Sequence, residues 1–225
     1  MKAVHKHLLL KYLLCFVLGI SGLNVQSQRI YDNDIRAFVV ADSLHPPGAE
    51  TTLFTGSSSI RMWDGIEDYF PGLPLSQRGF GGSTIDDLVY YAPQIILPYT
   101  WKQIVIYCGE NDLANDPTLT TDSLFANFKT LFRIIRSHQE NVPILFISLK
   151  PSNNRLVHLA RFKEANEKIR QFLEQQPNSQ FVDIWPLMLN EKGLPDSNLF
   201  LDDGLHMNAK GYVRWTQELK KYLIP

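Results

Sequence analysis

Three consecutive serines, Ser57 to Ser59, follow a β-branched, aromatic run and a glycine in the stretch LFTGSSSIRMW. A serine hydroxyl acts as a nucleophile when a base takes its proton, a third group holds that base, and hydrogen-bond donors stabilise the oxyanion. Serine is also a preferred helix N-cap, where its hydroxyl accepts a bond from a free backbone N–H. The serines alone predict a cap, so a catalytic interpretation depends on partner groups elsewhere in the chain.

One histidine has the surroundings of a catalytic base. His206 lies in the loop FLDDGLHMNAKGY, with Asp203 three residues before it. That spacing lets Asp203 accept a hydrogen bond from Nδ1–H and leaves Nε2 free to act as a base. Asp202 is expected to face away or to cap. The other histidines beyond residue 27 lie in helical segments or a proline-rich turn: His45, His138 and His158.

Two further loops could supply oxyanion donors. In QRGFGGSTIDDL, Gly82 has no side chain and can bring its backbone N–H close to a substrate, and in YCGENDL the Asn111 amide can donate. Each such donor is worth roughly 3 to 4 kcal/mol to the transition state of acyl transfer. Taken singly, such loops are more often turns and caps. Together, the four loops contain every group that acyl transfer requires.

Five apolar, β-rich segments alternate with amphipathic segments of helical spacing. The β-rich segments cover residues 51–55, 73–78, 103–108, 143–149 and 180–185, and helical periodicity is clear over 123–138 and 161–176. This order predicts an α/β fold, a flavodoxin-like three-layer α/β/α sandwich with a five-stranded parallel sheet and right-handed crossovers. Ligands bind at the carboxyl ends of such strands, so we expect the four loops to converge there.

The N-terminus has the layout of a signal peptide. Three lysines within residues 2–11 precede an apolar run over 12–23, and small and polar residues follow. The run is shorter than the roughly 20 residues of a membrane-spanning helix, which leaves an uncleaved anchor as the alternative. We expect a signal peptide over residues 1–27, one domain over 28–225, and export to the periplasm or the extracellular space.

Composition excludes several classes of partner. Removal of residues 1–27 takes away three lysines and no acidic residue, which lowers the formal net charge from −1 to about −4. Nucleic acid is therefore not an expected partner, because nucleic-acid-binding proteins need a basic patch. Cys108 would be the sole remaining cysteine, and no Cys and His cluster has zinc-ligand spacing. We expect no disulfide, metal or cofactor, and the oligomeric state stays open.

The four loops resemble the sequence blocks of the SGNH (GDSL-type) hydrolases, most closely bacterial relatives of the platelet-activating-factor acetylhydrolase catalytic subunits. The similar pieces are FTGSSSIRMW, RGFGGST, GEND and DGLH, and the similarity covers residues 53–211. Ser57 stands where the family usually has aspartate. The resemblance implies a nucleophile whose own N–H helps to bind the oxyanion, a glycine and an asparagine donor, and an Asp–His pair: Ser58, Gly82, Asn111, Asp203 and His206.

The reaction expected from these groups is ester hydrolysis through an acyl-enzyme, without a cofactor. Short loops and the absence of a long apolar lid favour a small acyl group such as acetyl, and a carbohydrate ester fits an exported enzyme. Trp63, Phe80 and Trp185 lie near predicted loop ends and could contact a sugar or a leaving group. Large aromatic residues at such positions are, as the alternative, often part of the core edge.

Three rival functions are also compatible with the sequence. A lysophospholipase-like lipid esterase would use the same catalytic groups on a longer chain. A flavodoxin-like protein could bind a phosphorylated ligand at the glycines over residues 79–82, although Thr84 stands where a dinucleotide fingerprint requires glycine. A weakly catalytic protein could keep the pocket for binding alone.

Overall fold

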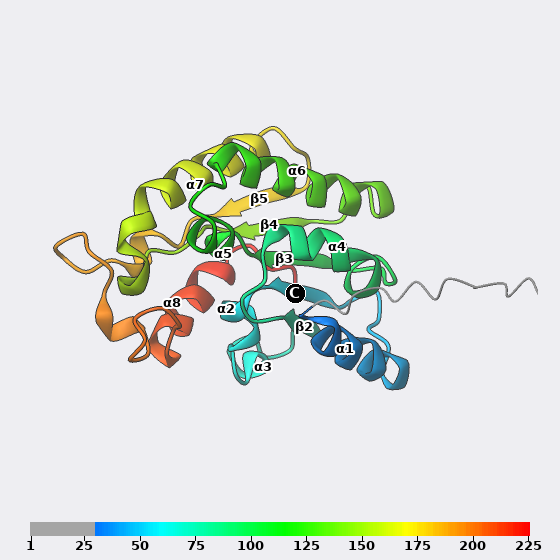
Figure 1. Ribbon diagram of the computed structural model, residues 1–225. Helices are drawn as coiled ribbons and strands as arrows, with labels where there is room; N and C mark the ends of the chain where they lie inside the picture. The colour runs from blue at the N-terminus through cyan, green and yellow to red at the C-terminus, as the bar shows by residue number, and fades with distance from the viewer. Residues whose placement is uncertain (1–29) are drawn as a thin grey trace, which may run out of the picture. The chain divides into compact units, whose positions relative to one another are not determined.

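The computed structural model describes residues 30–225, so the expected signal peptide, its cleavage site and a domain start at residue 28 lie outside the described residues. Five parallel strands form one sheet in the order β2-β1-β3-β4-β5 (Figure 1). The strands are β1 (Thr52–Gly56), β2 (Leu75–Gly79), β3 (Gln103–Tyr107), β4 (Ile144–Ile147) and β5 (Ser179–Val182). The predicted five-stranded parallel sheet is confirmed, and its strand order is that of flavodoxin.

Helices cover both faces of the sheet, as the sequence predicted (Figure 1). One layer contains α1, α4, α6 and α7, and the other contains α2, α3 and α8. The helices are α1 (Asp32–Leu44), α2 (Ser58–Arg61), α3 (Ile66–Tyr69), α4 (Ile85–Ile95), α5 (Glu110–Asn115), α6 (Thr121–His138), α7 (Leu159–Leu173) and α8 (Ala209–Leu219), with 3₁₀ turns η1 (Asn153–His158), η2 (Pro186–Met188) and η3 (Ser197–Leu199).

The central strands are buried on both faces because their side chains alternate between two apolar layers. On β3, Ile104 and Ile106 pack against the layer of α1, α4, α6 and α7, whereas Val105 and Tyr107 pack against the layer of α2, α3 and α8. The predicted amphipathic segments correspond to α6 and α7. The predicted core side chains of α6 are all buried: Leu124, Phe128, Leu131 and Ile135.

The carboxyl end of β1 lies against the carboxyl end of β3. Gly56 has φ of 142°, and a Cβ built there would lie 1.9 Å from the Tyr107 carbonyl oxygen. The next residue, Ser57, donates its backbone N–H to that same oxygen at 3.0 Å. Only glycine allows this approach, which sets where the chain leaves β1 and begins α2.

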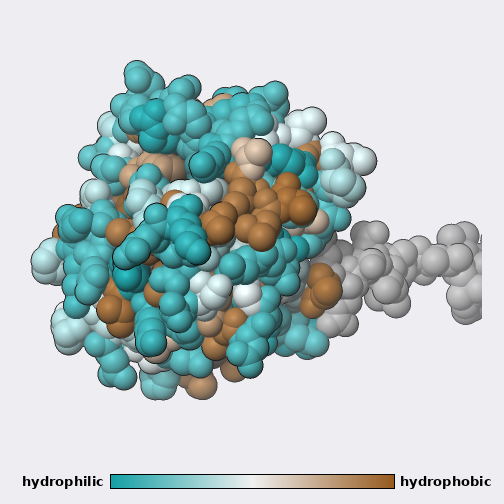
Figure 2. Space-filling view, turned by 90° about the vertical axis from the view of Figure 1, so that its left-hand side faces the viewer, coloured by the Kyte–Doolittle hydropathy of each residue, from teal (hydrophilic) through white to brown (hydrophobic). Residues whose placement is uncertain are grey.

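The surface at the carboxyl ends of the strands is mainly polar. Figure 2 views the molecule from the side toward which the strands point in Figure 1, and it shows a mostly hydrophilic face with a larger hydrophobic patch near its centre and smaller ones around it. Over residues 30–225, no helix combines the length and apolar composition needed to cross a membrane.

Replacing Gly56 with alanine should lower the free energy of unfolding by at least about 2 kcal/mol, because the new Cβ collides with the Tyr107 carbonyl. Urea unfolding would measure this loss. Gly48→Ala is the matched control: a Cβ at residue 48 meets no atom within 4 Å, so a change within about 0.5 kcal/mol is expected. Equal effects at the two positions would contradict the close approach.

Candidate active site

The four polar loops meet at the carboxyl ends of the strands, as the fold predicted. A cavity of about 720 Å³ is lined there by residues of all four loops, among them Ser58, Gly82, Asn111 and His206. Residues from four separate segments of the chain therefore share one solvent-accessible space.

Two hydrogen bonds connect a serine, a histidine and an aspartate at this cavity. His206 Nε2 lies 3.0 Å from Ser58 Oγ, and His206 Nδ1 lies 2.5 Å from Asp203 Oδ2. The other carboxylate oxygen of Asp203 accepts the backbone N–H groups of Leu205 and His206 at 2.8 and 2.9 Å. These bonds hold the imidazole with one nitrogen toward the serine hydroxyl and the other toward the carboxylate.

The Asp203 carboxylate is stabilised in its ionised form. Partial burial raises the pKa of Asp203, but hydrogen bonds from the Leu205 N–H and from His206 outweigh that effect and leave the pKa below its usual value. A carboxylate with a lowered pKa is suited to stabilise a positive charge on the adjacent ring. Asp202 is exposed and makes no contact of this kind.

Ser58 alone of the three serines lines the cavity. It is the first residue of α2, so its backbone N–H has no partner within the helix. Ser57 and Ser59 are 3% and 1% exposed. Ser57 occupies the N-cap position but makes no side-chain capping bond, and the Ser59 carbonyl accepts a hydrogen bond from the Tyr212 hydroxyl at 3.1 Å. The two flanking serines are thus structural neighbours of Ser58.

Gly82 and Asn111 lie on the loops that were predicted to donate hydrogen bonds. Asn111 donates one N–H of its amide to the Ser83 carbonyl at 3.1 Å, which leaves the second N–H of that group for a ligand. Gly82 has φ of 87°, a conformation that favours glycine. Within the described part of the chain, its backbone N–H has no acceptor.

A buried carboxylate joins these two loops. Asp112, next to Asn111 in α5, accepts the Ile85 N–H at the start of α4 at 3.0 and 3.2 Å. Burial raises the pKa of Asp112 to about 7, even though the Ile85 N–H favours the ionised form. The bond ties the loop of Gly82 to the loop of Asn111.

A buried ion pair, which the sequence analysis missed, lies below the same loops. Lys150 Nζ is 2.8 Å from Glu110 Oε2, and the two side chains are 1% and 6% exposed. Lys150 also lies 3.4 Å from the Tyr107 hydroxyl, whose pKa is raised by burial and by Glu110. Lys150 directly follows the mainly apolar segment FISL. A lysine at the end of a buried strand is uncommon, and this position was the sequence feature that could have indicated a buried ion pair.

The structure corrects the expectation of substrate contact for two of the three predicted aromatic residues, Trp63 and Phe80. Trp63 and Phe80 are both 0% exposed, so neither ring can stack on a ligand. Trp63 packs among other rings of the α8 side, with its ring centroid 4.9 Å from that of Tyr212. Trp185 is partly buried and lines a different cavity of about 280 Å³, where Lys163 lies 5.3 Å from its ring centroid. For Trp63 and Phe80 the core alternative is correct.

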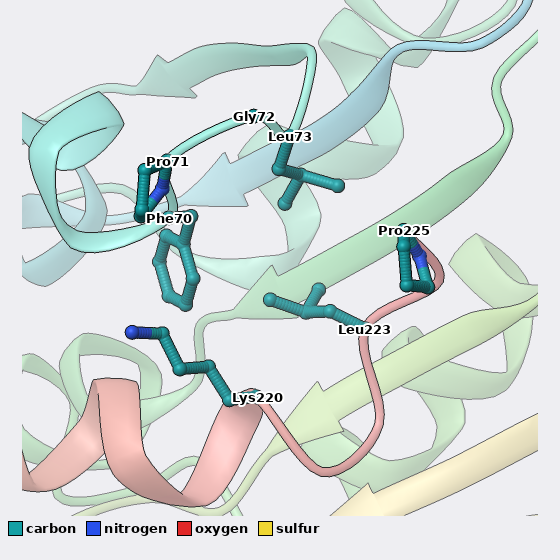
Figure 3. Close-up of a pocket in the computed structure, with 7 residues that line it drawn as sticks. All are labelled: Phe70, Pro71, Gly72, Leu73, Lys220, Leu223 and Pro225. Atoms are coloured by element: carbon teal, nitrogen blue, oxygen red, sulfur yellow. The ribbon is translucent and has the colours of Figure 1, made fainter.

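A more apolar cavity of about 260 Å³ lies at the opposite end of the sheet. Leu73 precedes β2, and in Figure 3 the side chains of Phe70 and Leu73 face Leu223 across this space. It shares no lining residue with the cavity of Ser58. In residues 30–225, no three His, Cys, Asp or Glu side chains are grouped to hold a metal ion.

Comparison with known protein families shows to which family the chain belongs. Residues 48–214 match the GDSL-like Lipase/Acylhydrolase family, a match that covers most of the sequence. The protein therefore belongs to this family of hydrolases, as the resemblance of its four loops predicted. No curated protein sequence matches it.

Solved structures share the fold at low sequence identity. A protein from Streptococcus pneumonia described as a platelet activating factor has a TM-score of 0.76 at 17% identity, over 85% of this chain and 92% of that one. A GDSL-like lipase from Bacteroides thetaiotaomicron has a TM-score of 0.70 at 16% identity, over 83% of this chain and 95% of that one. A catalytic mutant of an acetylxylan esterase from Geobacillus stearothermophilus has a TM-score of 0.63 at 15% identity, over 77% of this chain and 94% of that one.

The raised pKa of Asp112 predicts a pH-dependent loss of stability. The folded state holds this proton up to about pH 7, whereas an unfolded aspartate loses it near pH 4, so folding becomes less favourable as pH rises between these values. Asp112→Asn keeps an acceptor for Ile85 and removes the titration. Relative to wild type, its free energy of unfolding should rise with pH by up to about 1 kcal/mol per unit between pH 5 and 7.

Denaturant unfolding at several pH values would measure that difference. Asp116→Asn is the control, because hydrogen bonds from Thr118 lower the pKa of this exposed carboxylate and it is ionised in both states above pH 5. Its difference from wild type should be flat over the same range. A flat difference for Asp112→Asn as well would contradict a buried, protonated Asp112.

Proposed function

We propose that this protein is a serine esterase in which Ser58 is the nucleophile, His206 the general base and Asp203 the group that orients the base. The observation that carries the proposal is the pair of hydrogen bonds from Ser58 through His206 to Asp203, at 3.0 and 2.5 Å. Nucleophile, base and orienting group within hydrogen-bond distance define this type of site. Membership of a family of acylhydrolases supports the same reaction.

The reaction proceeds in two half-reactions. His206 Nε2 takes the proton of Ser58 as Oγ attacks the ester carbonyl, and the tetrahedral oxyanion receives hydrogen bonds from the N–H groups of Ser58 and Gly82 and from the Asn111 amide. Collapse of this intermediate breaks the bond to the alcohol oxygen, which takes the proton from His206. Water then attacks the acyl-enzyme with His206 as base, and the acid and free serine are released.

Asp203 supports both half-reactions through the imidazole. Its hydrogen bond to Nδ1 selects the tautomer in which Nε2 can accept the serine proton, and its negative charge stabilises the imidazolium that forms. The lowered pKa of Asp203 keeps that charge in place at neutral pH. Asp203 itself stays ionised through the cycle.

We propose short acyl esters, chiefly acetyl esters of carbohydrates, as the substrates. Met62 and Leu205 are the apolar side chains among the cavity's lining residues, which offers little surface to a long chain. Structural neighbours that include the acetylxylan esterase and a carbohydrate esterase family 3 protein from Talaromyces cellulolyticus are compatible with this class. The burial of Trp63 and Phe80 removes ring stacking as a reason for it.

Two alternatives keep some support. A lysophospholipase-like lipid esterase is compatible with the structural likeness to a GDSL-like lipase, and it would use the same Ser58. A non-catalytic binder of phosphorylated ligands would use the loop of Gly82 but would have no need of the Ser58–His206 hydrogen bond. We also propose that residues 1–27 direct export, which would bring the enzyme to extracytoplasmic polysaccharides.

An ester chain-length series tests the proposal directly. For wild type, kcat/KM should be highest with p-nitrophenyl acetate and fall toward octanoate, and acetate should be released from acetylated xylan or peptidoglycan fragments. Ser58→Ala should abolish hydrolysis, whereas Ser57→Ala, which removes a buried hydroxyl without a capping bond, should keep most of it.

The opposite results identify the alternatives. A kcat/KM that rises steadily from acetyl to octanoyl, with no acetate from the polysaccharides, would assign the protein as a lipid esterase. Retention of full activity in Ser58→Ala would overturn the assignment of Ser58 as the nucleophile. The absence of any hydrolysis by wild type would favour a non-catalytic binding function.

A further inference from the structure

Two arginines that the proposed reaction does not use line the cavity of Ser58. Arg61 lies on α2, three residues after Ser58, and Arg155 lies on η1. Across residues 30–225, neither guanidinium group forms an ion pair or a hydrogen bond. Asp64 lines the same cavity but pairs with neither of them.

The lack of partners is unusual for a partly buried arginine in this protein. Arg78 pairs with Asp42 at 2.6 Å, Arg136 donates to the Val142 carbonyl, and Arg161 donates to the Leu113 carbonyl. Arg155 is also partly buried, and its Nε, like that of Arg136, is buried without a hydrogen-bond partner. Arg136 still donates from its other two guanidinium nitrogens to carbonyls, whereas over residues 30–225 no guanidinium nitrogen of Arg155 has a partner. A buried donor that lacks a partner is costly, and such exceptions point to a functional role.

Arg155 is held beside the proposed base. The preceding residue, Asn154, donates its backbone N–H to the Gly204 carbonyl at 3.0 Å and its amide to the Asp203 carbonyl at 3.2 Å. Arg155 has non-helical backbone angles, φ −115° and ψ 21°, within η1. Arg155, which lines the cavity, is therefore held next to the loop that contains His206, where the leaving alcohol takes its proton.

Arg61 brings a second positive charge to the loop of the oxyanion donors. A Cβ built at Gly81 would lie 2.8 Å from Arg61 Nη1, so the guanidinium lies directly over the glycine that precedes Gly82. The absence of a side chain at residue 81 leaves room for this placement. The cavity is thus lined by two arginines, one held next to the loop of His206 and one next to the loop of Gly82.

We propose that Arg155 and Arg61 bind an oxyanion group, a carboxylate or a phosphate, on the alcohol part of the ester. The planar guanidinium group presents paired donors that match both groups, and such charge-assisted bonds are stronger than neutral ones. The inference rests on the proposed esterase function and specifies its substrate class: an acetylated molecule, such as an acidic sugar, that carries a negative charge near the ester.

Aryl acetates that differ in charge test this inference without requiring a particular sugar. The probes are 4-acetoxybenzoate, which carries a carboxylate, 4-acetoxyphenyl phosphate, and 4-acetoxybenzamide, a neutral match in shape for the benzoate. For each enzyme the measured quantity is the ratio of kcat/KM for a charged probe to kcat/KM for the benzamide. The probe with the higher ratio distinguishes a carboxylate from a phosphate as the favoured group.

In Arg155→Gln this ratio should fall about tenfold from the wild-type value, mainly through KM. The ratio for Arg155→Lys should lie between those of wild type and Arg155→Gln, because lysine keeps the charge but loses the paired donor geometry. Arg61→Gln, at an exposed position that leaves folding intact, should lower the ratio as well. Arg133→Gln, an exposed arginine on α6, is the matched control and should leave the ratio unchanged.

Different outcomes would overturn the oxyanion subsite and the esterase function. If wild type hydrolyses all three probes through Ser58 but neither arginine substitution lowers the ratio for either charged probe, the oxyanion subsite is wrong and the esterase stands. If Ser58→Ala hydrolyses the probes as well as wild type does, the proposed function itself fails.

Discussion

The contact between the ends of β1 and β3 is the constraint on which the rest of the site depends. Ser57 donates its N–H to the Tyr107 carbonyl at 3.0 Å, and Gly56 has no Cβ that would block that approach. The bond directs the chain from the strand into α2 and so places Ser58 at the edge of the sheet. The Tyr212 hydroxyl then joins α8 to α2 through the Ser59 carbonyl, which brings the loop of His206 toward the same edge.

Polar groups buried beneath the loops hold them at some cost in stability. Lys150 and Glu110 form an ion pair that is almost completely excluded from water, and Asp112 holds a proton up to about pH 7 because burial disfavours its charge. Buried ion pairs of this kind contribute little net stability, since desolvation offsets their attraction. Their effect here is positional: Glu110 and Asp112 flank Asn111 and fix the helix that presents its amide.

The features that follow from periodicity and chain order could be predicted from the sequence. Alternation of strands and helices predicts a parallel sheet, and the loops at its carboxyl ends then bring Ser58 and His206 together although they are distant along the chain. Which side chains at segment ends are buried could not be predicted, because that burial depends on residues of other elements that pack against them. Trp63 is covered by α8, and Arg155 reaches the cavity from a 3₁₀ turn without a recognisable pattern.

The most direct measurement of the central claim is the site of covalent modification by a fluorophosphonate, located by mass spectrometry of peptides. A hydroxyl activated by His206 and aligned with the oxyanion donors reacts with this probe, whereas an ordinary serine does not. The account predicts one adduct, on Ser58, that is lost in His206→Ala. An adduct on Ser57 or Ser59, or no labelling of the folded wild-type protein, would contradict it.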